Sequence, residues 1–204
     1  MSNLQQIKEH FSKQNYSRER WATHSQSSDS LIPFLQNLNA NLILDIGCGT
    51  NPYKEHVNNL IGIDVGNYPE ADINLSCQEV KALNIFQDNC ADAVLALGSI
   101  NFGTWQDVKN QINMCVDWCK PGGYIVLRAR LNDHTELNLK KNFLQYGWQV
   151  QDIYNLTAEW QDRVEFISEP VIETAAGGDG KGAGHGKPDH SRKINLAVWY
   201  WRKL

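Results

Sequence analysis

One stretch decides the fold of this chain: Leu42-Ile43-Leu44-Asp45-Ile46-Gly47-Cys48-Gly49-Thr50-Asn51. Its first five residues predict a buried strand, and the Gly-x-Gly that follows lets the backbone turn without a Cβ that would block a ligand. In an open α/β sheet, the carboxyl end of the first strand is where nucleotide-like ligands bind. A lone Gly-x-Gly is weak evidence, so this interpretation depends on the segments around it.

The segments that follow the turn predict a parallel sheet. Further strands are expected at Leu60–Asp64, Ala71–Leu75, Ala91–Leu97 and Tyr124–Leu127. Several of them are nearly continuous in apolar residues, which is typical of parallel strands buried on both faces. Thr104 can cap an amphipathic helix that stops before Lys120-Pro121-Gly122-Gly123. We therefore expect helices on both faces of the sheet.

Residues 1–40 have a different pattern and predict two short helices. The apolar residues of the first helix recur at helical spacing: Leu4, Ile7 and Phe11. The second helix can be capped by Ser30. We expect residues 1–40 to form an N-terminal helical cap and residues 41–204 to form the main domain.

The C-terminal third is less regular. Thr135 can cap a helix that Gly147 ends, and Trp148–Tyr154 is strand-like. The β-prone segment Ile194–Trp201 is predicted as the last strand. Before it lies segment 174–190, where six of the fifteen glycines fall within ten positions. Because glycine loses the most backbone entropy on folding, we expect a mobile loop inserted there.

Composition and charge exclude several classes of protein. Hydrophobic residues make up 42% of the chain and charged residues 21%, which excludes a disordered or collagen-like chain. The net charge of −4 argues against a non-specific nucleic-acid binder, which would be basic. The five cysteines lack paired spacing, so we expect reduced thiols in a cytoplasmic protein. Neither a signal peptide nor a membrane-spanning stretch is predicted.

Two acidic residues strengthen the prediction of a ligand site. Asp45 stands two residues before Gly47, and the second strand ends in Asp64, whose carboxylate can accept both hydroxyls of a ribose. With these features the sequence resembles the class I S-adenosylmethionine-dependent methyltransferases of the small Rossmann-like, type 11-like kind. The resemblance covers about residues 40–150. It consists of DIGCGTN (45–51) as motif I, IGID (61–64) as the ribose-binding strand, ADAVLALGS (91–99) as the fourth strand and KPGGYIVLR (120–128) as the fifth.

This resemblance implies a Rossmann-like three-layer α/β sandwich, with a mostly parallel seven-stranded sheet whose last strand is antiparallel. It also implies S-adenosyl-L-methionine as cofactor. The glycine turn would approach the methionine part, with Asp45 helping to hold its amino group, while Asp64 would bind the ribose. The adenine would lie near Ser76 and Cys77. The implied cofactor-binding residues are Asp45, Gly47, Cys48, Gly49, Asp64, Val65, Ser76 and Cys77.

Three positions bear on how well the family pattern fits. Asn51 replaces the third glycine of the turn, and asparagine visits left-handed backbone geometry more readily than most residues. Ser76 stands where many members carry an acid that contacts adenine. A nicotinamide-binding fold would show a similar turn and acid, but it needs a third glycine where this chain has Pro52. The methyltransferase interpretation is therefore preferred.

Acceptor residues are harder to identify than cofactor residues. Methyl transfer from a sulfonium is an in-line displacement, so alignment and exclusion of water can suffice without a general base. We therefore assign no catalytic residue. The candidates for the acceptor side are Ser99, Asn101 and Phe102 after the fourth strand, Arg128 and Arg130 after the fifth, and Tyr16 and Trp21 in the cap. Each also has a structural interpretation, as a strand-end polar group, a rim charge or a packing aromatic.

The class of acceptor stays open between a small molecule, which we favour, and a protein side chain. The two candidate arginines would suit an anionic acceptor. A nucleic-acid acceptor is disfavoured, because GSINFG (98–103) lacks the Asn/Asp-Pro-Pro-Tyr/Phe signature of amino-methylating DNA enzymes. A non-catalytic binding module with the same fold is the alternative from another class. The glycine-rich loop is interpreted as a lid or a linker. We predict no metal there, because its possible ligands lack fixed spacing: Asp179, His185, Asp189 and His190.

Overall fold

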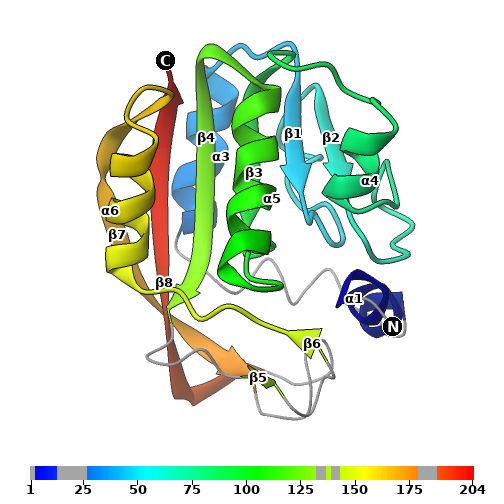
Figure 1. The fold of residues 1–204 in the computed structure, drawn as a ribbon, viewed down its shortest axis with the longest axis vertical. Coiled ribbons are helices and arrows are strands. Elements are labelled where there is room, and N and C mark those ends of the chain that lie inside the picture. The colour runs from blue at the N-terminus through cyan, green and yellow to red at the C-terminus, as the bar shows by residue number, and fades with distance from the viewer. Residues whose placement is uncertain (1–2, 13–26, 132–136, 139–142, 179–187) are drawn as a thin grey trace.

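The computed structural model describes residues 3–12, 27–131, 137–138, 143–178 and 188–204 (Figure 1). In these residues a six-stranded sheet has the order β2-β1-β3-β4-β8-β7. Its strands are β1 (Ile43–Ile46), β2 (Leu60–Ile63), β3 (Ala91–Leu97), β4 (Cys119–Leu131), β7 (Val164–Gly178) and β8 (Pro188–Lys203). β1 pairs in parallel with β2 and β3, and β3 does so with β4. β8 runs antiparallel to both β4 and β7.

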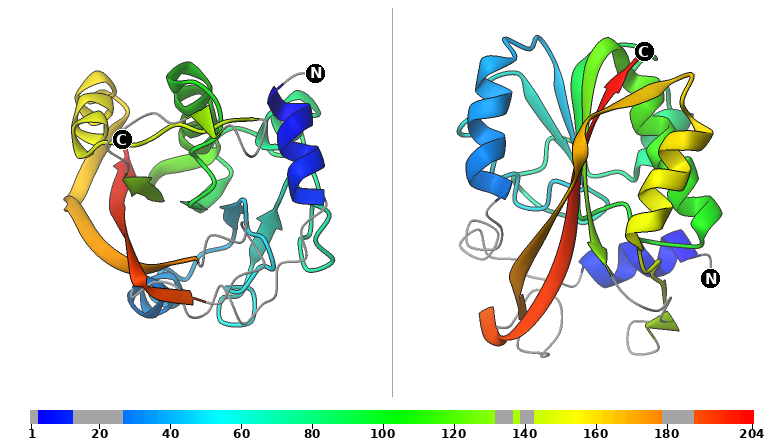
Figure 2. Two further views of the ribbon diagram at one scale, coloured as in Figure 1. Left: turned by 90° about the horizontal axis from the view of Figure 1, so that it is seen from below. Right: turned by 90° about the vertical axis from the view of Figure 1, so that its left-hand side faces the viewer.

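Helices cover both faces of this sheet. They are α1 (Asn3–Ser12), α3 (Ser27–Asn37), α4 (Cys77–Ala82), α5 (Trp105–Trp118) and α6 (Val150–Glu159). Figure 2 shows α5 and α6 on one face and α3 on the other, so the molecule has the expected three layers. Two short strands pair with each other outside the main sheet: β5 (Leu137–Asn138) and β6 (Phe143–Leu144).

Each face of the sheet has its own apolar core. Val94 of β3 packs in the core on the α5 side, whereas the next residue, Leu95, packs with Leu31 and Leu35 of α3 on the other side. The central strands thus bury side chains on both faces, which explains their continuously apolar sequences. The prediction of parallel strands between two helical layers is confirmed for β1, β2, β3 and β4.

The predicted number of seven strands is wrong, because the described residues form six in the main sheet. The expected strand Ala71–Leu75 makes a single bridge, between Ile73 and Ile63. The side chain of Asn74 instead donates to the carbonyl oxygen of Gly66 (2.8 Å). This local hydrogen bond competes with pairing along the strand, so no ladder extends from the bridge.

The strand expected at Trp148–Tyr154 is also wrong, because most of this segment belongs to α6. The carboxylate of Asp152 accepts a hydrogen bond from the backbone N–H of Gln149 (2.9 Å), which caps the start of the helix. Ile153 and Leu156 then face the core at helical spacing. The Asp152 cap and the helical spacing of the buried residues outweigh the β propensity of Val150 and Tyr154 inside the helix.

The helix predicted between Thr135 and Gly147 is also wrong, because the described residues of this segment include two short strands. Thr135 lies outside the described residues, and Leu137 pairs antiparallel with Leu144 in β5 and β6. This pairing joins residues that a helix would keep on separate turns. The helix predicted after Thr104, by contrast, is confirmed: Thr104 accepts a hydrogen bond from the N–H of Asp107 (3.3 Å), and α5 ends at Trp118.

Segment 174–190 is a loop only in part. Residues 174–178 complete β7 and residues 188–190 begin β8, with Gly177 opposite Asp189. The antiparallel ladder supplies backbone partners that offset the entropy cost of these small residues. The rest of the predicted loop lies outside the described residues. The C-terminal part of the sheet therefore has two strands, β7 and β8, in antiparallel pairing, where only one antiparallel strand was predicted.

Several elements gather at the carboxyl edge of the parallel strands. α1 lies there, β5 and β6 lie beside it, and the hairpin of β7 and β8 extends past the same edge (Figures 1 and 2). The two N-terminal helices thus have different places, since α3 packs on the sheet and α1 lies at its edge. Among the described residues, no helix combines the length and the apolar character needed to cross a membrane.

Candidate functional site

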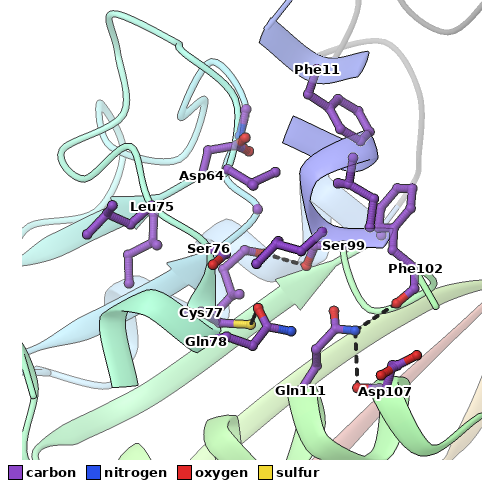
Figure 3. A pocket seen from close by; sticks show the side chains of 18 of the residues that line it. Phe11, Asp64, Leu75, Ser76, Cys77, Gln78, Ser99, Phe102, Asp107 and Gln111 are labelled. Carbon is purple, nitrogen blue, oxygen red and sulfur yellow. Dashed lines mark hydrogen bonds between the residues drawn. The ribbon is translucent and has the colours of Figure 1, made fainter. Parts of the chain in front are cut away.

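A cavity of about 320 Å³ opens at the carboxyl ends of β1, β2 and β3, beneath α1 (Figure 3). Its wall combines the glycine turn after β1, the end of β2, the start of α4, the end of β3 and the inner sides of α1 and α5. Eight of the residues predicted from the sequence line it: Gly47, Gly49, Asp64, Val65, Ser76, Cys77, Ser99 and Phe102. Asp45, Cys48, Asn101 and Arg128 do not line it.

The turn after β1 requires glycine at its first position. Gly47 has φ +74°, and a Cβ built there would lie 2.2 Å from the Cβ of Ser99 at the end of β3. The N–H groups of Gly47 and Cys48 both donate to the carbonyl oxygen of Ile63 (2.7 and 3.1 Å), which ties the turn to β2. The backbone can therefore approach a ligand closely at this point.

Asn51 takes the left-handed conformation expected of it, with φ +51°. Its side-chain amide donates to the carbonyl oxygen of Glu70 (3.1 Å) and to Asp72 (3.3 Å). Asp72 also accepts the N–H of Gly62 in β2 (2.9 Å) and pairs with Lys54. Asn51 thus replaces a glycine in the turn and, in addition, links the turn to the segment after β2.

Asp64 ends β2 and points its carboxylate at the glycine turn. Only 7% of the residue is exposed, and the N–H groups of Gly49 (2.8 Å) and Gly66 (2.6 Å) each donate to one of its two oxygens. Burial raises the pKa of Asp64, while these two backbone donors oppose the rise. Each oxygen keeps a further lone pair for a ligand, so the carboxylate can still accept two hydroxyls.

Asp45 lies inside β1 with 2% of its surface exposed, behind the cavity wall. Burial, with a smaller contribution from the charge of Asp64, raises the pKa of Asp45 to about 7, and the charge of Arg128 opposes this rise. Arg128 donates to the carbonyl oxygen of Leu97 at the end of β3 (3.0 Å). Asp45 and Arg128 are therefore neighbours of the cavity wall rather than parts of it.

Ser76 and Cys77 begin α4. The Ser76 hydroxyl accepts the N–H of Glu79 (3.2 Å) and the Glu79 carboxylate accepts the N–H of Ser76 (2.9 Å), which together form a capping box. Burial raises the pKa of the Cys77 thiol to about 12, so it presents an uncharged surface to the cavity. Gln78, which follows, also lines the cavity.

The acceptor-side candidates lie in different places. The Ser99 hydroxyl lines the cavity but donates to the carbonyl oxygen of Ile46, which ties β3 to β1. Asn101 is buried away from the cavity, and Arg130 is exposed on β4. Phe102 lines the cavity and meets the ring of Phe11 edge to face, with 5.4 Å between centroids. Tyr16 and Trp21 lie outside the described residues.

The sequence did not identify two parts of the wall. One is the inner face of α1, where Leu4, Ile7 and Phe11 point into the cavity. Their helical spacing was visible, but nothing in the sequence placed this helix over the turn. The other part is Gln111 of α5, a polar residue on a face that also carries the buried Val108. That interruption of an apolar face was a usable signal.

These features define a class of protein before any comparison: an α/β protein with a small-ligand site at the carboxyl edge of its parallel strands. Residues 44–127 match the family model described as "Methyltransferase domain". The segment that holds the glycine turn and Asp64 is therefore similar to a methyltransferase domain, and S-adenosyl-L-methionine is the cofactor whose fit to the cavity is tested below. No curated protein matches the chain.

Solved methyltransferase structures share the fold at low sequence identity. The 1,6-didemethyltoxoflavin-N1-methyltransferase of Burkholderia thailandensis is 12% identical, with a TM-score of 0.63 over 92% of this chain and 82% of that one. The N-methyltransferase NodS of Bradyrhizobium japonicum WM9 is 15% identical, with a TM-score of 0.58 over 99% of each chain. Geranyl diphosphate C-methyltransferase of Streptomyces coelicolor A3(2) is 10% identical, with a TM-score of 0.61 over 100% and 99%. Likenesses at this level show the fold alone.

The described residues of the cavity fit the cofactor. Gly47 leaves room for close approach, and the free lone pairs of Asp64 suit a ribose. Leu75 and the uncharged Cys77 offer an apolar surface for a planar base. The accepting carboxylate of Asp64 and the apolar walls of the cavity thus match a molecule with a polar sugar at its centre.

Proposed function

We propose that this protein transfers a methyl group from S-adenosyl-L-methionine to a small-molecule acceptor. One observation carries the proposal: the glycine turn, the Asp64 carboxylate and the apolar face of α1 surround a single cavity of about 320 Å³. This volume lies in the range of small-ligand sites, which is roughly 300–1,000 Å³. Two of the similar structures contain small substrates, namely geranyl diphosphate and 1,6-didemethyltoxoflavin.

The cofactor roles follow the order of the wall. The backbone at Gly47 and Gly49 would lie against the methionine part, and Asp64 with the adjacent Val65 would hold the ribose. Ser76 and Cys77 would lie at the adenine, where the Ser76 hydroxyl is already used to cap α4. Cys48 and Asp45 would act from behind the wall, Cys48 by supporting the turn and Asp45 by its buried charge.

The chemistry needs alignment more than acid or base. S-adenosyl-L-methionine supplies an electrophilic methyl group when it is bound. Ser99 holds the end of β3 against β1, and the side chains of Leu4, Ile7 and Phe11 cover the cavity with apolar surface. A covered cavity keeps water away and fixes the acceptor near the reacting carbon, which lowers the barrier without a proton-transfer group.

The acceptor side is largely uncharged. Arg128 is directed to a backbone carbonyl and Arg130 lies on the surface, so neither supports the hypothesis of an anionic acceptor. Among the described lining residues, the only charged side chains are the carboxylates of Asp64 and Asp107, and the second caps α5. A neutral acceptor fits this wall better than an anion.

Replacement of Asp64 by alanine tests the proposal. We expect Asp64→Ala to weaken binding of S-adenosylhomocysteine about 100-fold or more, because two charge-assisted hydrogen bonds to the ribose are lost. Calorimetric titration measures this loss. The matched control is Asp162→Ala, which removes an exposed carboxylate just after α6. This variant should bind S-adenosylhomocysteine as the wild type does. Unchanged affinity in Asp64→Ala would contradict the assignment of the ribose site.

A further inference from the structure

Gln111 is a polar side chain in an apolar setting. It lies on α5 between the fully buried Val108 and Ile112, and only 9% of its surface is exposed. That small exposed part lines the cavity. A buried amide is costly unless its donors and acceptors have partners, so the partners of Gln111 show what the cavity is built to receive.

The orientation of the Gln111 amide is fixed by two backbone carbonyls. Its Nε2 donates to the carbonyl oxygen of Phe102 (2.8 Å) and to that of Asp107 (3.2 Å). Rotating the amide by 180° would place Oε1 against both carbonyl oxygens, so only one orientation satisfies the network. Oε1 is then directed away from α5 toward the cavity, as Figure 3 shows.

Gln111 Oε1 lacks a donor within the protein as described. Its two hydrogen bonds both use Nε2, and no residue of the described ranges donates to the oxygen. The nearby carboxylate of Asp107 accepts from the N–H and hydroxyl of Thr104 (2.8 Å each). The Phe102 ring next to it offers no polar group. The oxygen therefore has free acceptor capacity that faces the cavity and is open to a ligand.

We propose that Gln111 is a specificity-determining residue, whose Oε1 accepts a hydrogen bond from an N–H or O–H group of a small molecule in the cavity. This inference rests on the proposed function, because it assigns the cavity to a cofactor and a methyl acceptor. Two sources carry such a donor: the adenine amino group of the cofactor, and an amine, amide or hydroxyl of the acceptor. A ligand without the donor leaves a buried oxygen unpaired and is rejected.

The cofactor source is tested by changing the ligand. S-adenosylhomocysteine and S-inosylhomocysteine differ in the base, where the second carries a carbonyl in place of the amino donor. Calorimetric titration of the wild type should show at least about a tenfold preference for the adenosyl compound if adenine is the partner. Gln111→Met, similar in size but without the oxygen, should reduce that preference to within about threefold.

The acceptor source is tested in the presence of saturating S-adenosylhomocysteine. The probes are ring fragments paired with their methylated forms: indole with 1-methylindole, phenol with anisole, and aniline with N,N-dimethylaniline. Ligand-observed NMR titrations give the affinity of each. If the acceptor is the partner, the donor-bearing member of a binding pair is favoured about tenfold or more in the wild type, and this preference is lost in Gln111→Met.

The control variant is Gln106→Met, the same substitution on α5 at an exposed glutamine that bonds only to Asn110. It should keep the wild-type preference in both experiments. The inference is overturned if donor-bearing and donor-free ligands bind wild-type protein equally in both experiments, or if Gln111→Met keeps the full preference. The wild-type comparison needs no variant to fold. Failure of the wild type to bind S-adenosylhomocysteine would instead overturn the proposed function.

Discussion

The two halves of the sheet are built in different ways. Strands β2, β1, β3 and β4 are parallel, and both faces of β1 and β3 are buried. Strands β8 and β7 are antiparallel, and β7 is an edge strand that leaves Ile167, Val171 and Ile172 exposed. The strands that line the proposed cofactor site belong to the parallel half, whereas the hairpin extends past the edge where the cavity opens.

This difference separates the tasks of binding and support. Gly47, Gly49 and Asp64 come from the ends of two neighbouring strands, so small backbone changes there move the site itself. Trp199 of the antiparallel strand β8 packs against Trp148, which precedes α6, and both indoles are fully buried, so this layer stabilises the sheet. Mutations in the first half should therefore change binding, and mutations in the second half should change stability.

The largest effect is expected from Gly47→Ala. The added Cβ meets Ser99 at 2.2 Å, and the backbone has φ +74°, so we expect a destabilisation of about 3 kcal/mol together with loss of cofactor binding. Gly122→Ala is the control, since its φ is +77° but no atom lies within 4 Å, and it should cost only about 1 kcal/mol. Urea unfolding of both variants tests this. Equal losses would show that close packing at Gly47 is unimportant.

Asp45→Asn should change the pH dependence of stability. The folded-state pKa of about 7 exceeds the ordinary value of 3.8, so folded protein holds this proton more tightly than unfolded protein does. The stabilisation of the folded state by this bound proton is fully present below pH 4 and is lost as the pH rises through 7. The unfolding free energy of the variant should thus exceed that of the wild type by on the order of 4 kcal/mol at pH 8, and this gain should be lost near pH 4. Urea unfolding of both proteins from pH 4 to pH 8 measures this difference. Unfolding free energies that change with pH in the same way in both proteins would contradict the raised pKa of Asp45.

Trp148→Phe probes the tryptophan layer that packs against the antiparallel strand β8. The indole N–H of Trp148 donates to the buried carbonyl oxygen of Ile100 (3.1 Å), so the change should destabilise the fold by about 1.5 kcal/mol. Affinity for S-adenosylhomocysteine should stay within about twofold, because Trp148 does not line the cavity. A tenfold loss of affinity at unchanged stability would contradict the separation between the two halves.

The smallest effect is expected at the contact between α1 and α4. Lys8 pairs with Glu79, and both are partly exposed, so Lys8→Ala should cost about 0.5 kcal/mol. Because α1 covers the cavity, cofactor affinity should fall by roughly twofold. Lys109→Ala, which breaks a similar pair with Glu159 away from the cavity, should leave affinity unchanged. Equal cofactor affinities in the two variants would contradict the prediction that the position of α1 affects cofactor binding.

The same contrast explains what could be predicted from the sequence. Strands such as Ala91–Leu97 are apolar throughout because both faces are covered, so local composition reveals them. The left-handed geometry of Asn51 was likewise predictable from its residue type. The hairpin was not, since residues 174–178 become strand only through pairing with a distant segment.

The candidate site shows a similar limit. Motif residues such as Gly47 and Asp64 lie together because strand ends meet at one edge of a parallel sheet. Asp45 of β1 and Arg128 of β4 also come from parallel strands but lie behind the wall, and no local pattern distinguishes these positions. α1 reaches the cavity through contacts with α4 and β6 that are far apart in sequence, such as the N–H of Leu144 to Asn3 (3.0 Å).

The most direct test of the account is a parallel calorimetric titration of the purified protein with S-adenosylmethionine, S-adenosylhomocysteine and NAD. The glycine turn and the Asp64 carboxylate predict binding of the first two at micromolar concentration and no binding of NAD. Binding of NAD alone, or of none of the three, would contradict the assignment of this cavity to S-adenosyl-L-methionine.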